Sequence, residues 1–413
     1  MTPAPVPSAG TVAGTVAGSM PQRPGRQLPQ PVLTLLWALM AAALLGWPFL
    51  LLAPNRLVTG QGLALASLAS GAQAWLLLPI ALLLALCAWP DRRRQALRDG
   101  LTALGAGLLL VGLVAVAGQE AALQSRQAGA LARVSLGGGF WAASLLAWAM
   151  TADALRRLPV GRVGRAAAQA LLLLPLAGLL AGGVLDQLSL LKEYANRQDV
   201  FQAALWRHGQ IVGAALLPTL LIGLPLGLAA ARRPALGRPL LAALNLVQTV
   251  PSIALFGLLI APLAALGAAW PGSGVQGIGL LPAVIALTLY ALLPVVHGLA
   301  SGLQQVDPAV IDAATGMGLS PRQRFWQVEL PLALPVLWSA LRLSTVQLIG
   351  LAVVAALIGA GGLGAIIFQG LLSSALDLVL LGVLPVVGLA LAVDAGFDLI
   401  ATALAPAGPR PPR

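Results

Sequence analysis

Residues 307–331 read DPAVIDAATGMGLSPRQRFWQVELP, a polar stretch that lies between two apolar runs at 279–299 and 335–358. Each run has the length of about 20 residues that a transmembrane helix needs. Both runs exceed the roughly ten residues of a barrel strand, and neither alternates with a period of two. Because lipid offers no partner to backbone N–H and C=O groups, such runs are expected to be helices. The polar stretch therefore connects two predicted membrane-spanning helices.

The same kind of apolar run recurs along most of the chain. The other runs lie at about 32–53, 70–89, 100–118, 136–152, 166–185, 211–230, 240–266 and 376–403. Of the 413 residues, 59% are hydrophobic and only 9% are charged, whereas soluble domains carry about 25% charged residues. This composition excludes a soluble protein. It predicts an all-α integral membrane protein with about ten transmembrane helices.

The distribution of basic residues predicts how the chain crosses the membrane. Lys and Arg occur as small clusters between the apolar runs, which is typical of cytoplasmic loops. If every run crosses once from a cytoplasmic N-terminus, 17 of the 24 Lys and Arg residues face the cytoplasm and six face the other side. We therefore predict a multi-pass protein of the bacterial plasma (inner) membrane with both termini in the cytoplasm. Since the net charge of +11 forms no single basic stripe, nucleic-acid binding is not expected.

The scarcity of cysteine and histidine limits the chemistry of the chain. Cys87 is the single cysteine, and the two histidines, His208 and His297, lie far apart without metal-ligand spacing. A disulfide framework and a metal site are therefore not expected. No Walker A motif occurs in the sequence, so we expect no ATP hydrolysis by this chain.

The polar stretch itself has the signals of two short helices. Asp307 is a good N-cap and is followed by proline at the first helical position, and Gly318 follows the end of that helix. Ser320 caps a second helix, with Gln323 three residues later in a capping-box arrangement. We expect this second helix to end near Pro331, where the chain returns to the membrane.

The spacing of residues in this stretch resembles the EAA motif of the permease subunits of ATP-binding-cassette (ABC) importers. That motif is Glu-Ala-Ala, three residues, Gly, nine residues and Ile-x-Leu-Pro. The spacing is intact, with Asp in place of Glu and Val in place of Ile. Here the motif reads Asp312-Ala313-Ala314, Gly318 and Val328-Glu329-Leu330-Pro331. We call residues 300–334 the EAA-like loop.

Flanking segments resemble a subfamily, the osmoprotectant permeases for glycine betaine, choline, carnitine and proline betaine. The resemblance covers about 206–404, and the N-terminal half looks like the extra spans of a longer branch. The segments that carry it are 219–233, 245–259, 289–298 and 355–370.

The resemblance implies a domain organisation in which the C-terminal five spans form a type I ABC importer permease core. The predicted segments are a disordered cytoplasmic tail (1–30), a five-span N-terminal region (31–185), an external connector (186–210), the permease core (211–404) and a cytoplasmic tail (405–413).

The resemblance also implies a function for the EAA-like loop, which in such importers docks into a groove on a separate ATPase. Small alanines allow close approach of a partner, Asp312 offers a carboxylate, and Gly318 permits a sharp turn. The residues expected to couple to the ATPase are Asp312, Ala313, Ala314, Gly318, Arg322, Arg324, Phe325, Val328, Leu330 and Pro331. An amphipathic loop lying on the bilayer is the alternative, but it would not require this spacing.

The expected partners follow from the same resemblance. They are two ABC ATPase subunits, an external solute-binding protein, a second permease (the same chain or a related one) and membrane lipid. The chain itself is expected to bind no cofactor, because ATP belongs to the partner ATPase subunits.

Two groups of residues are candidates for the translocation pathway or a gate. One surrounds a proline that interrupts an apolar run and frees a backbone carbonyl, which polar side chains could satisfy while lining, or not lining, a pathway. The other is a glycine-rich run, which we call the glycine loop, residues 359–364; it could form a gate or simply allow close packing. The candidates are Gln248, Thr249, Pro251, Ser252, Gly359, Gly361, Gly362 and Gly364.

Three charged residues fall inside the last predicted spans. Arg342 lies in the run 335–358, and Asp394 and Asp398 lie one helical turn apart in the run 376–403. An Arg342–Asp394 pair and a snorkelling Arg342 with Asp398 at the membrane edge are the two main alternatives.

The sequence thus predicts an ABC importer permease for an osmoprotectant such as glycine betaine or choline. One alternative is an importer permease for an amino acid such as methionine. Another, from a different class, is an ion-coupled secondary transporter, which would be expected to carry ionisable residues at the membrane midplane. The first five runs contain almost none.

Overall fold

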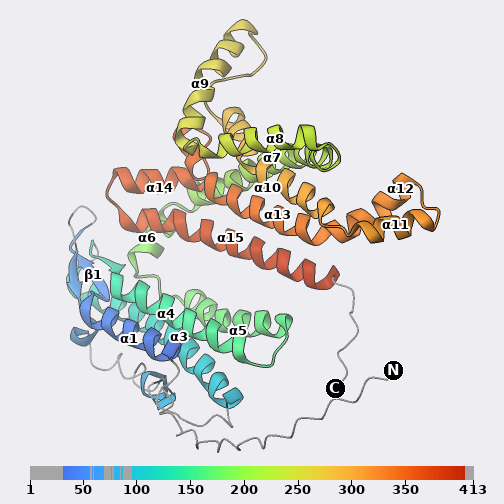
Figure 1. The fold of residues 1–413 in the computed structure, drawn as a ribbon. Helices are drawn as coiled ribbons and strands as arrows, with labels where there is room; N and C mark the ends of the chain where they lie inside the picture. The colour runs from blue at the N-terminus through green and yellow to red at the C-terminus, as the bar shows by residue number, and fades with distance from the viewer. Residues whose placement is uncertain are drawn as a thin grey trace, which may run out of the picture.

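The computed structural model describes residues 31–404 apart from 56–57, 59, 69–75, 77–78, 84, 87–94 and 130. The predicted tails 1–30 and 405–413, and much of the apolar run 70–89, lie outside the described residues. Within the described residues the chain is mostly helical, in two groups of helices that lie side by side (Figure 1).

The N-terminal group contains five described helices and a small sheet. The helices are α1 (Pro31–Gly46), α3 (Gln95–Ala128), α4 (Gly138–Arg157), α5 (Arg162–Ala181) and α6 (Ser189–Asn196). A 3-10 turn (Leu65–Ser67) lies in the connection after α1. Buried apolar side chains between residues 33 and 188 form one hydrophobic cluster in this group.

The prediction of an all-helical protein is wrong at this sheet. Strands β1 (Leu50–Ala53), β2 (Gln61–Leu63) and β3 (Arg133–Leu136) pair in the antiparallel order β2-β1-β3. They lie in the connections after α1 and before α4, so the sheet satisfies backbone groups that no helix would pair. The register places Leu50 opposite both Leu63 and Leu136.

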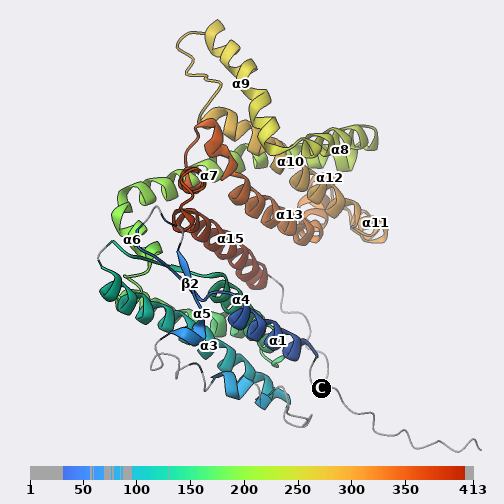
Figure 2. The ribbon, with the colours of Figure 1, turned by 90° about the vertical axis from the view of Figure 1, so that its left-hand side faces the viewer.

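The C-terminal group contains the remaining helices. They are α7 (Gln198–Arg232), α8 (Pro234–Thr249), α9 (Ser252–Ala269), α10 (Leu280–Gln304), α11 (Pro308–Gly316), α12 (Pro321–Arg324), α13 (Leu330–Leu351), α14 (Leu363–Leu372) and α15 (Leu376–Leu404). A second large cluster of buried side chains, between residues 211 and 386, lies in this group. Helix α9 projects away from the other helices (Figure 2).

Six described helices are long and apolar enough to cross a membrane, and five of them lie in the C-terminal group. These are α3, α7, α9, α10, the continuous helix Pro321–Leu351 and α15 up to Ala401. Shorter apolar helical stretches occur at Val32–Gly46, Ala167–Ala181 and Leu363–Leu372. The chain is therefore an integral membrane protein by composition and helix length.

Two predicted spans are interrupted by proline. The run 32–53 is helical only to Gly46, because Pro48 follows two residues later, and it continues as strand β1. The run 240–266 is divided between α8 and α9, since Val250, which precedes Pro251, is extended with ψ at 128°. A residue before proline is disfavoured in the helical conformation, which explains both breaks.

Glycines bring three helices of the C-terminal group into close contact. A Cβ atom at Gly223 of α7 would lie 3.0 Å from Val295 of α10, and one at Gly227 would lie 3.0 Å from Leu299. A Cβ atom at Gly302 of α10 would likewise lie 3.0 Å from the Ala333 carbonyl oxygen of α13. Small residues four positions apart allow helix backbones to approach closely in lipid. Helices α7, α10 and α13 therefore form one closely packed layer.

Candidate coupling loop and gate

Helix α11 begins in the EAA-like loop as the sequence predicted. The Asp307 carboxylate accepts a hydrogen bond from the Ala309 N–H at 2.9 Å, and Pro308 occupies the first turn. The helix ends at Gly316, and Gly318 turns the chain with a φ of +81°. That left-handed conformation is one that glycine adopts without strain.

Helix α12 begins with the predicted capping box. Gln323 N–H donates to the Ser320 hydroxyl at 3.3 Å, and Ser320 N–H donates to the Gln323 side chain at 2.9 Å. The expected end at Pro331 is wrong, because the helix runs on through a π-helical turn (Phe325–Glu329) into α13. In that turn Leu330 N–H bonds to the Phe325 carbonyl, so the wider turn precedes the proline and the helix continues.

The residues of the EAA-like motif differ in exposure. Asp312 and Ala313 are exposed, whereas Ala314 is 1% exposed. The Ala314 carbonyl accepts the Leu319 N–H at 3.2 Å, which closes the turn after α11. Ala314 therefore packs inside the loop, and Asp312 and Ala313 form the surface that a partner can reach.

The outer surface of the loop combines apolar and basic side chains. Met317 is 74% exposed and Trp326 is 59% exposed. The Phe325 and Trp326 rings are edge to face, 5.3 Å apart. Large apolar side chains that are exposed on a protruding loop are typical of a protein-binding surface. The remaining candidate residues are Gly318, Arg322 and Pro331, which are exposed, and Arg324, Val328 and Leu330, which are half-buried.

A buried carboxylate anchors this loop, and sequence reasoning had assigned it no function. The Glu329 side chain is 4% exposed and pairs through Oε1 with Arg324 Nε at 2.9 Å and through Oε2 with Arg232 at the end of α7. Arg324 also donates to the Thr315 hydroxyl of α11 at 3.2 Å. The Arg232 guanidinium lies over the Phe325 ring at 5.8 Å. Both loop helices are thereby connected to α7.

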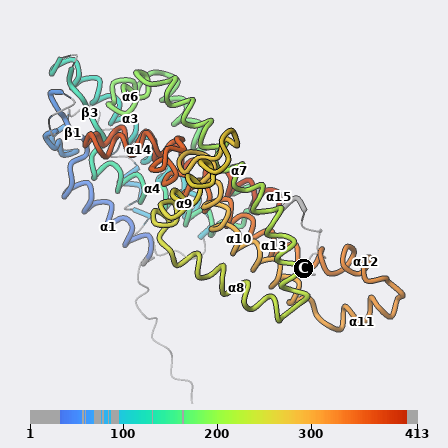
Figure 3. The backbone as a smooth tube through the Cα atoms, turned by 90° about the horizontal axis from the view of Figure 1, so that it is seen from above, coloured from blue at the N-terminus to red at the C-terminus, as the bar shows by residue number. Residues whose placement is uncertain are grey.

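The glycine loop lies near the start of α7 and toward α14, at the other end of this group from α11 and α12 (Figure 3). Gly359, Gly361 and Gly362 all have positive φ, between +79° and +82°. A Cβ atom at Gly364 would collide with the Val353 carbonyl. These four positions therefore need glycine for conformation or for space.

Helix α7 holds the glycine loop. Arg207 Nε donates to the Ala360 carbonyl at 3.1 Å. The fully buried His208 lies with Nε2 3.1 Å from the Ile349 carbonyl of α13, and a Cβ at Gly362 would lie 3.3 Å from its Nδ1. Directly before the glycine loop, the Ile358 carbonyl accepts a hydrogen bond at 2.7 Å from the N–H of Gly279, the residue that precedes α10.

The polar residues near Pro251 bond to backbone carbonyls. Gln248 donates to the Tyr290 carbonyl at 2.8 Å, and Thr249 donates to the Leu246 carbonyl at 2.7 Å. The Tyr290 hydroxyl in turn donates to the Val250 carbonyl. The half-buried Ser252 begins α9.

The three charged residues of the last predicted spans come together between α13 and α15. Arg342 Nη2 donates to Asp394 at 2.6 Å, and its Nη1 donates to Asp398. Arg342 therefore pairs with both aspartates at once. Among the described residues, no group of three His, Cys, Asp or Glu side chains could hold a metal ion.

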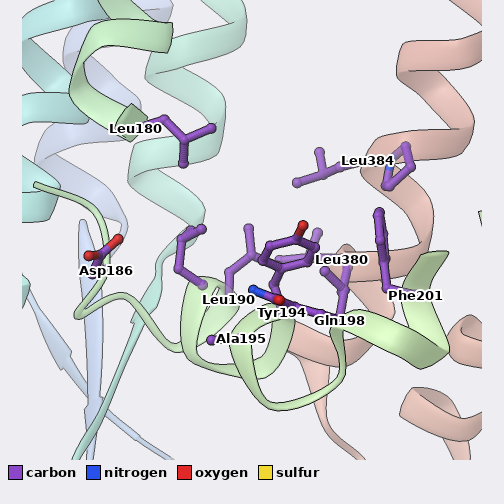
Figure 4. Close-up of a pocket in the computed structure, with 12 residues that line it drawn as sticks. Leu180, Asp186, Leu190, Tyr194, Ala195, Gln198, Phe201, Leu380 and Leu384 are labelled. Carbon is purple, nitrogen blue, oxygen red and sulfur yellow. The ribbon is translucent and has the colours of Figure 1, made fainter. Parts of the chain in front are cut away.

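A cavity of about 730 Å³ lies between α5, α6 and the first half of α15 (Figure 4). Half of its twelve lining residues are leucines from both helix groups, including Leu190 and Leu380. The Tyr194 ring meets Phe201 edge to face at 5.2 Å, and Asp186 lies at the rim away from this pair. The cavity is separate from the EAA-like loop and the glycine loop.

Two family models match this chain. The model for the N-terminal domain of the ABC transporter permease YehY matches residues 26–191. The model for the binding-protein-dependent transport system inner membrane component matches residues 223–407.

The chain is similar to permeases of known importers over its C-terminal half. The osmoprotectant import permease protein OsmW of Salmonella typhimurium is 38% identical over 50% of this chain and 92% of its own length. The carnitine transport permease protein OpuCB of Listeria monocytogenes is 35% identical, over 49% of this chain and 86% of its own length. The choline transport system permease protein OpuBB of Bacillus subtilis is 32% identical, over 49% and 88%. By these matches, this chain belongs to the binding-protein-dependent inner membrane components, the permease subunits of ABC importers.

Proposed function

We propose that the chain carries a small trimethylammonium osmolyte, such as glycine betaine, choline or carnitine, into the cytoplasm as the membrane-spanning subunit of its ABC importer. Relatives named for carnitine and choline transport support this substrate class. Both molecules carry a trimethylammonium group. Such cations are recognised through aromatic faces, and we place that recognition on the external binding protein.

The geometry of the EAA-like loop is the observation that carries the coupling part of the proposal. The loop presents an exposed carboxylate at Asp312, a small residue at Ala313 and the exposed apolar side chains of Met317 and Trp326. These features fit docking into a groove of a separate ATPase, which binds and hydrolyses the ATP. The chain needs no cofactor of its own for this function.

The membrane arrangement is part of the proposal. Arg207, at the glycine loop, and Arg232, at the EAA-like loop, are 25 residues apart in one helix, which corresponds to about 38 Å. Because the hydrocarbon core is about 30 Å thick, the two loops fit opposite faces of the membrane. We place the EAA-like loop and both termini in the cytoplasm and the glycine loop outside, with about ten spans.

The domain organisation follows the separate hydrophobic clusters of the two helix groups. We propose a five-span N-terminal region (31–185), an external connector (186–210) and a permease core (211–404). A second permease, the same chain or a related one, completes the importer together with two ATPase subunits and the external binding protein.

The gate and the pathway are assigned to the same core. We place the external gate at the glycine loop, where Gly359, Gly361 and Gly362 have left-handed backbones. The pathway is assigned to the break between α8 and α9, near Gln248 and Ser252. The Arg342 cluster is assigned to holding α13 against α15.

Uptake of radiolabelled substrate by cells that express the full importer tests this proposal. Asp312→Arg reverses the charge offered to the ATPase and is expected to abolish uptake while membrane insertion stays intact. Asp199→Arg, in the external connector and in the first turn of α7, is the matched control and should retain uptake. Unlabelled glycine betaine, choline and carnitine should compete, whereas methionine should not. Competition by methionine alone, or full uptake by Asp312→Arg, would contradict the assignment.

A further inference from the structure

We infer that Glu329 and His208 are positioning residues that fix the two ends of α7 to α13, so that a movement of the EAA-like loop is transmitted to the glycine loop. The inference rests on the proposed function, because it concerns how the ATPase contact reaches the gate. It assigns a function to two buried side chains, neither of which belongs to the docking surface.

The first attachment is at the EAA-like loop. Glu329, at the last position before α13, is buried and pairs with Arg232 of α7 and with Arg324 of the loop. Arg324 continues the contact to Thr315 of α11 at 3.2 Å. Removing one partner of a buried ion pair leaves a charge without compensation, which is strongly unfavourable. The loop is therefore held to the end of α7 rather than free to move alone.

The second attachment is at the glycine loop. Val353 N–H bonds to the Gly350 carbonyl at 3.3 Å, because the helix tightens there, and the Ile349 carbonyl is left for another donor. His208 Nε2 lies 3.1 Å from that carbonyl. Since a carbonyl only accepts, Nε2 carries the proton and donates, and Nδ1 faces Gly362. The adjacent Arg207 holds Ala360 of the same loop.

The two attachments define one antiparallel pair of helices. The end of α7 meets the start of α13 at Glu329, and the start of α7 meets the end of α13 at Ile349. Two internal prolines weaken the backbone hydrogen bonding of α7. The closely packed layer with α10, through Gly223 and Gly227, compensates for this weakness. Closely packed groups transmit displacement rather than absorb it.

The test uses the complete importer, with its ATPase and binding protein, in proteoliposomes. Glu329→Gln and Arg232→Gln are expected to keep co-purification of the ATPase within twofold of wild type. Uptake, and the stimulation of ATP hydrolysis by the loaded binding protein, should both fall at least tenfold. Arg232→Lys keeps the charge and should retain at least half of the wild-type stimulation. Arg233→Gln, at the exposed neighbour, should behave as wild type.

The same readouts apply at the other end. His208→Gln retains a side-chain N–H donor and should keep at least half of the stimulation, whereas His208→Leu should lose it at least tenfold with the ATPase still bound. Uncoupling by changes at His208 and Arg232, which are 24 residues apart in α7 and therefore about 36 Å from each other, would support transmission through α7. In the double variant Arg232→Gln/Glu329→Gln, the loss should be no larger than in Glu329→Gln alone, because both residues act through one contact.

Three results would overturn the inference. The first is wild-type stimulation of ATP hydrolysis in His208→Leu or in Glu329→Gln. The second is a loss of stimulation in Arg233→Gln as large as that in Arg232→Gln. The third is loss of ATPase co-purification in Glu329→Gln, which would make Glu329 a docking residue. If Glu329→Gln does not fold, Arg232→Gln decides the question, because the Arg232 side chain is 44% exposed. Absence of ATP-dependent uptake in the wild-type importer would instead refute the proposed function.

Discussion

Ser135 of strand β3 donates a hydrogen bond of 2.6 Å to the Asp377 carboxylate in the first turn of α15. This contact joins the sheet of the N-terminal group to the C-terminal group. Close by, Arg197, which precedes α7, donates to Gln369 of α14 at 3.1 Å and lies 3.6 Å from Glu193 of α6. The N-terminal group is therefore attached to the helices that adjoin the glycine loop, and not to the EAA-like loop.

Deletion of residues 1–185 is expected to leave a core that inserts into the membrane and binds the ATPase. The docking surface and its supporting helices lie in the retained part. Of the contacts in the preceding paragraph, the deletion removes only the hydrogen bond between Ser135 and Asp377. Co-purification of the ATPase with the truncated chain is the measurement. Loss of the ATPase from a well-inserted truncation would show that the N-terminal group supports docking.

Reporter fusions test the proposed orientation. A reporter fused after Arg94 or Arg165 is expected to be cytoplasmic, and one fused near Asn196 is expected to be external, because basic loops resist translocation. Alkaline phosphatase activity, which requires export, and a cytoplasmic fluorescent reporter give opposite signals at each site. Reversal at any of the three sites would contradict the span count or the orientation.

Gly318→Ala is expected to destabilise the turn between α11 and α12. The space around a Cβ at this position is open, so the cost comes from the left-handed backbone and amounts to about 1 kcal/mol. Trypsin cleavage at Arg322 under native conditions should accelerate about fivefold. The cleavage rate follows the population of the opened loop, which this free-energy cost raises.

Gly316→Ala is the control for this prediction. Gly316 lies within α11 with equally open space around it, and alanine favours a helix over glycine. Cleavage should be unchanged or slower. If both alanine variants are cleaved at the same rate, the left-handed turn does not determine the loop structure.

Gly364→Ala is expected to abolish uptake, because its Cβ would collide with the Val353 carbonyl, which is backbone and cannot rotate away. Gly350→Ala, at the next-to-last residue of α13 with open space around it, should retain uptake. Both variants should still bind the ATPase. Equal uptake by the two variants would count against a gate at the glycine loop.

Arg342→Gln should lower the yield of folded protein more than the triple variant Arg342→Gln/Asp394→Asn/Asp398→Asn. The single change removes the positive charge beside Asp394 and Asp398, whereas the triple change removes all three charges. Size-exclusion chromatography in mild detergent measures the folded fraction. A better yield from the single variant would show that the three charges are not coupled.

Sequence reasoning succeeded where the determinants are local. The caps at Asp307 and Ser320 and the turn at Gly318 need only neighbouring residues, and all three are present. The family was evident from the spacing of a few residues between position 312 and Pro331. The same local reasoning placed a helix end at Pro331, and it was wrong because the preceding π-helical turn is not encoded by one recognisable residue.

Contacts between residues that are far apart in the sequence could not be predicted from it. Arg232 and Glu329 are 97 residues apart, and neither stands out in a chain whose basic residues mostly mark loops. The sheet depends on strand β1 meeting β3 across the whole length of α3, which hydrophobic periodicity cannot reveal. The His208–Ile349 contact requires a helix to tighten at one carbonyl, a feature visible only in three dimensions.

ATP-dependent uptake in proteoliposomes tests the central claim most directly. The chain is reconstituted with its ATPase and loaded binding protein, and accumulation of labelled glycine betaine or choline is measured with and without ATP on the ATPase side. The account predicts accumulation that requires ATP, that persists when ion gradients are collapsed, and that is lost in Asp312→Arg. Accumulation driven by an ion gradient without ATP or ATPase would contradict it and would identify a secondary transporter.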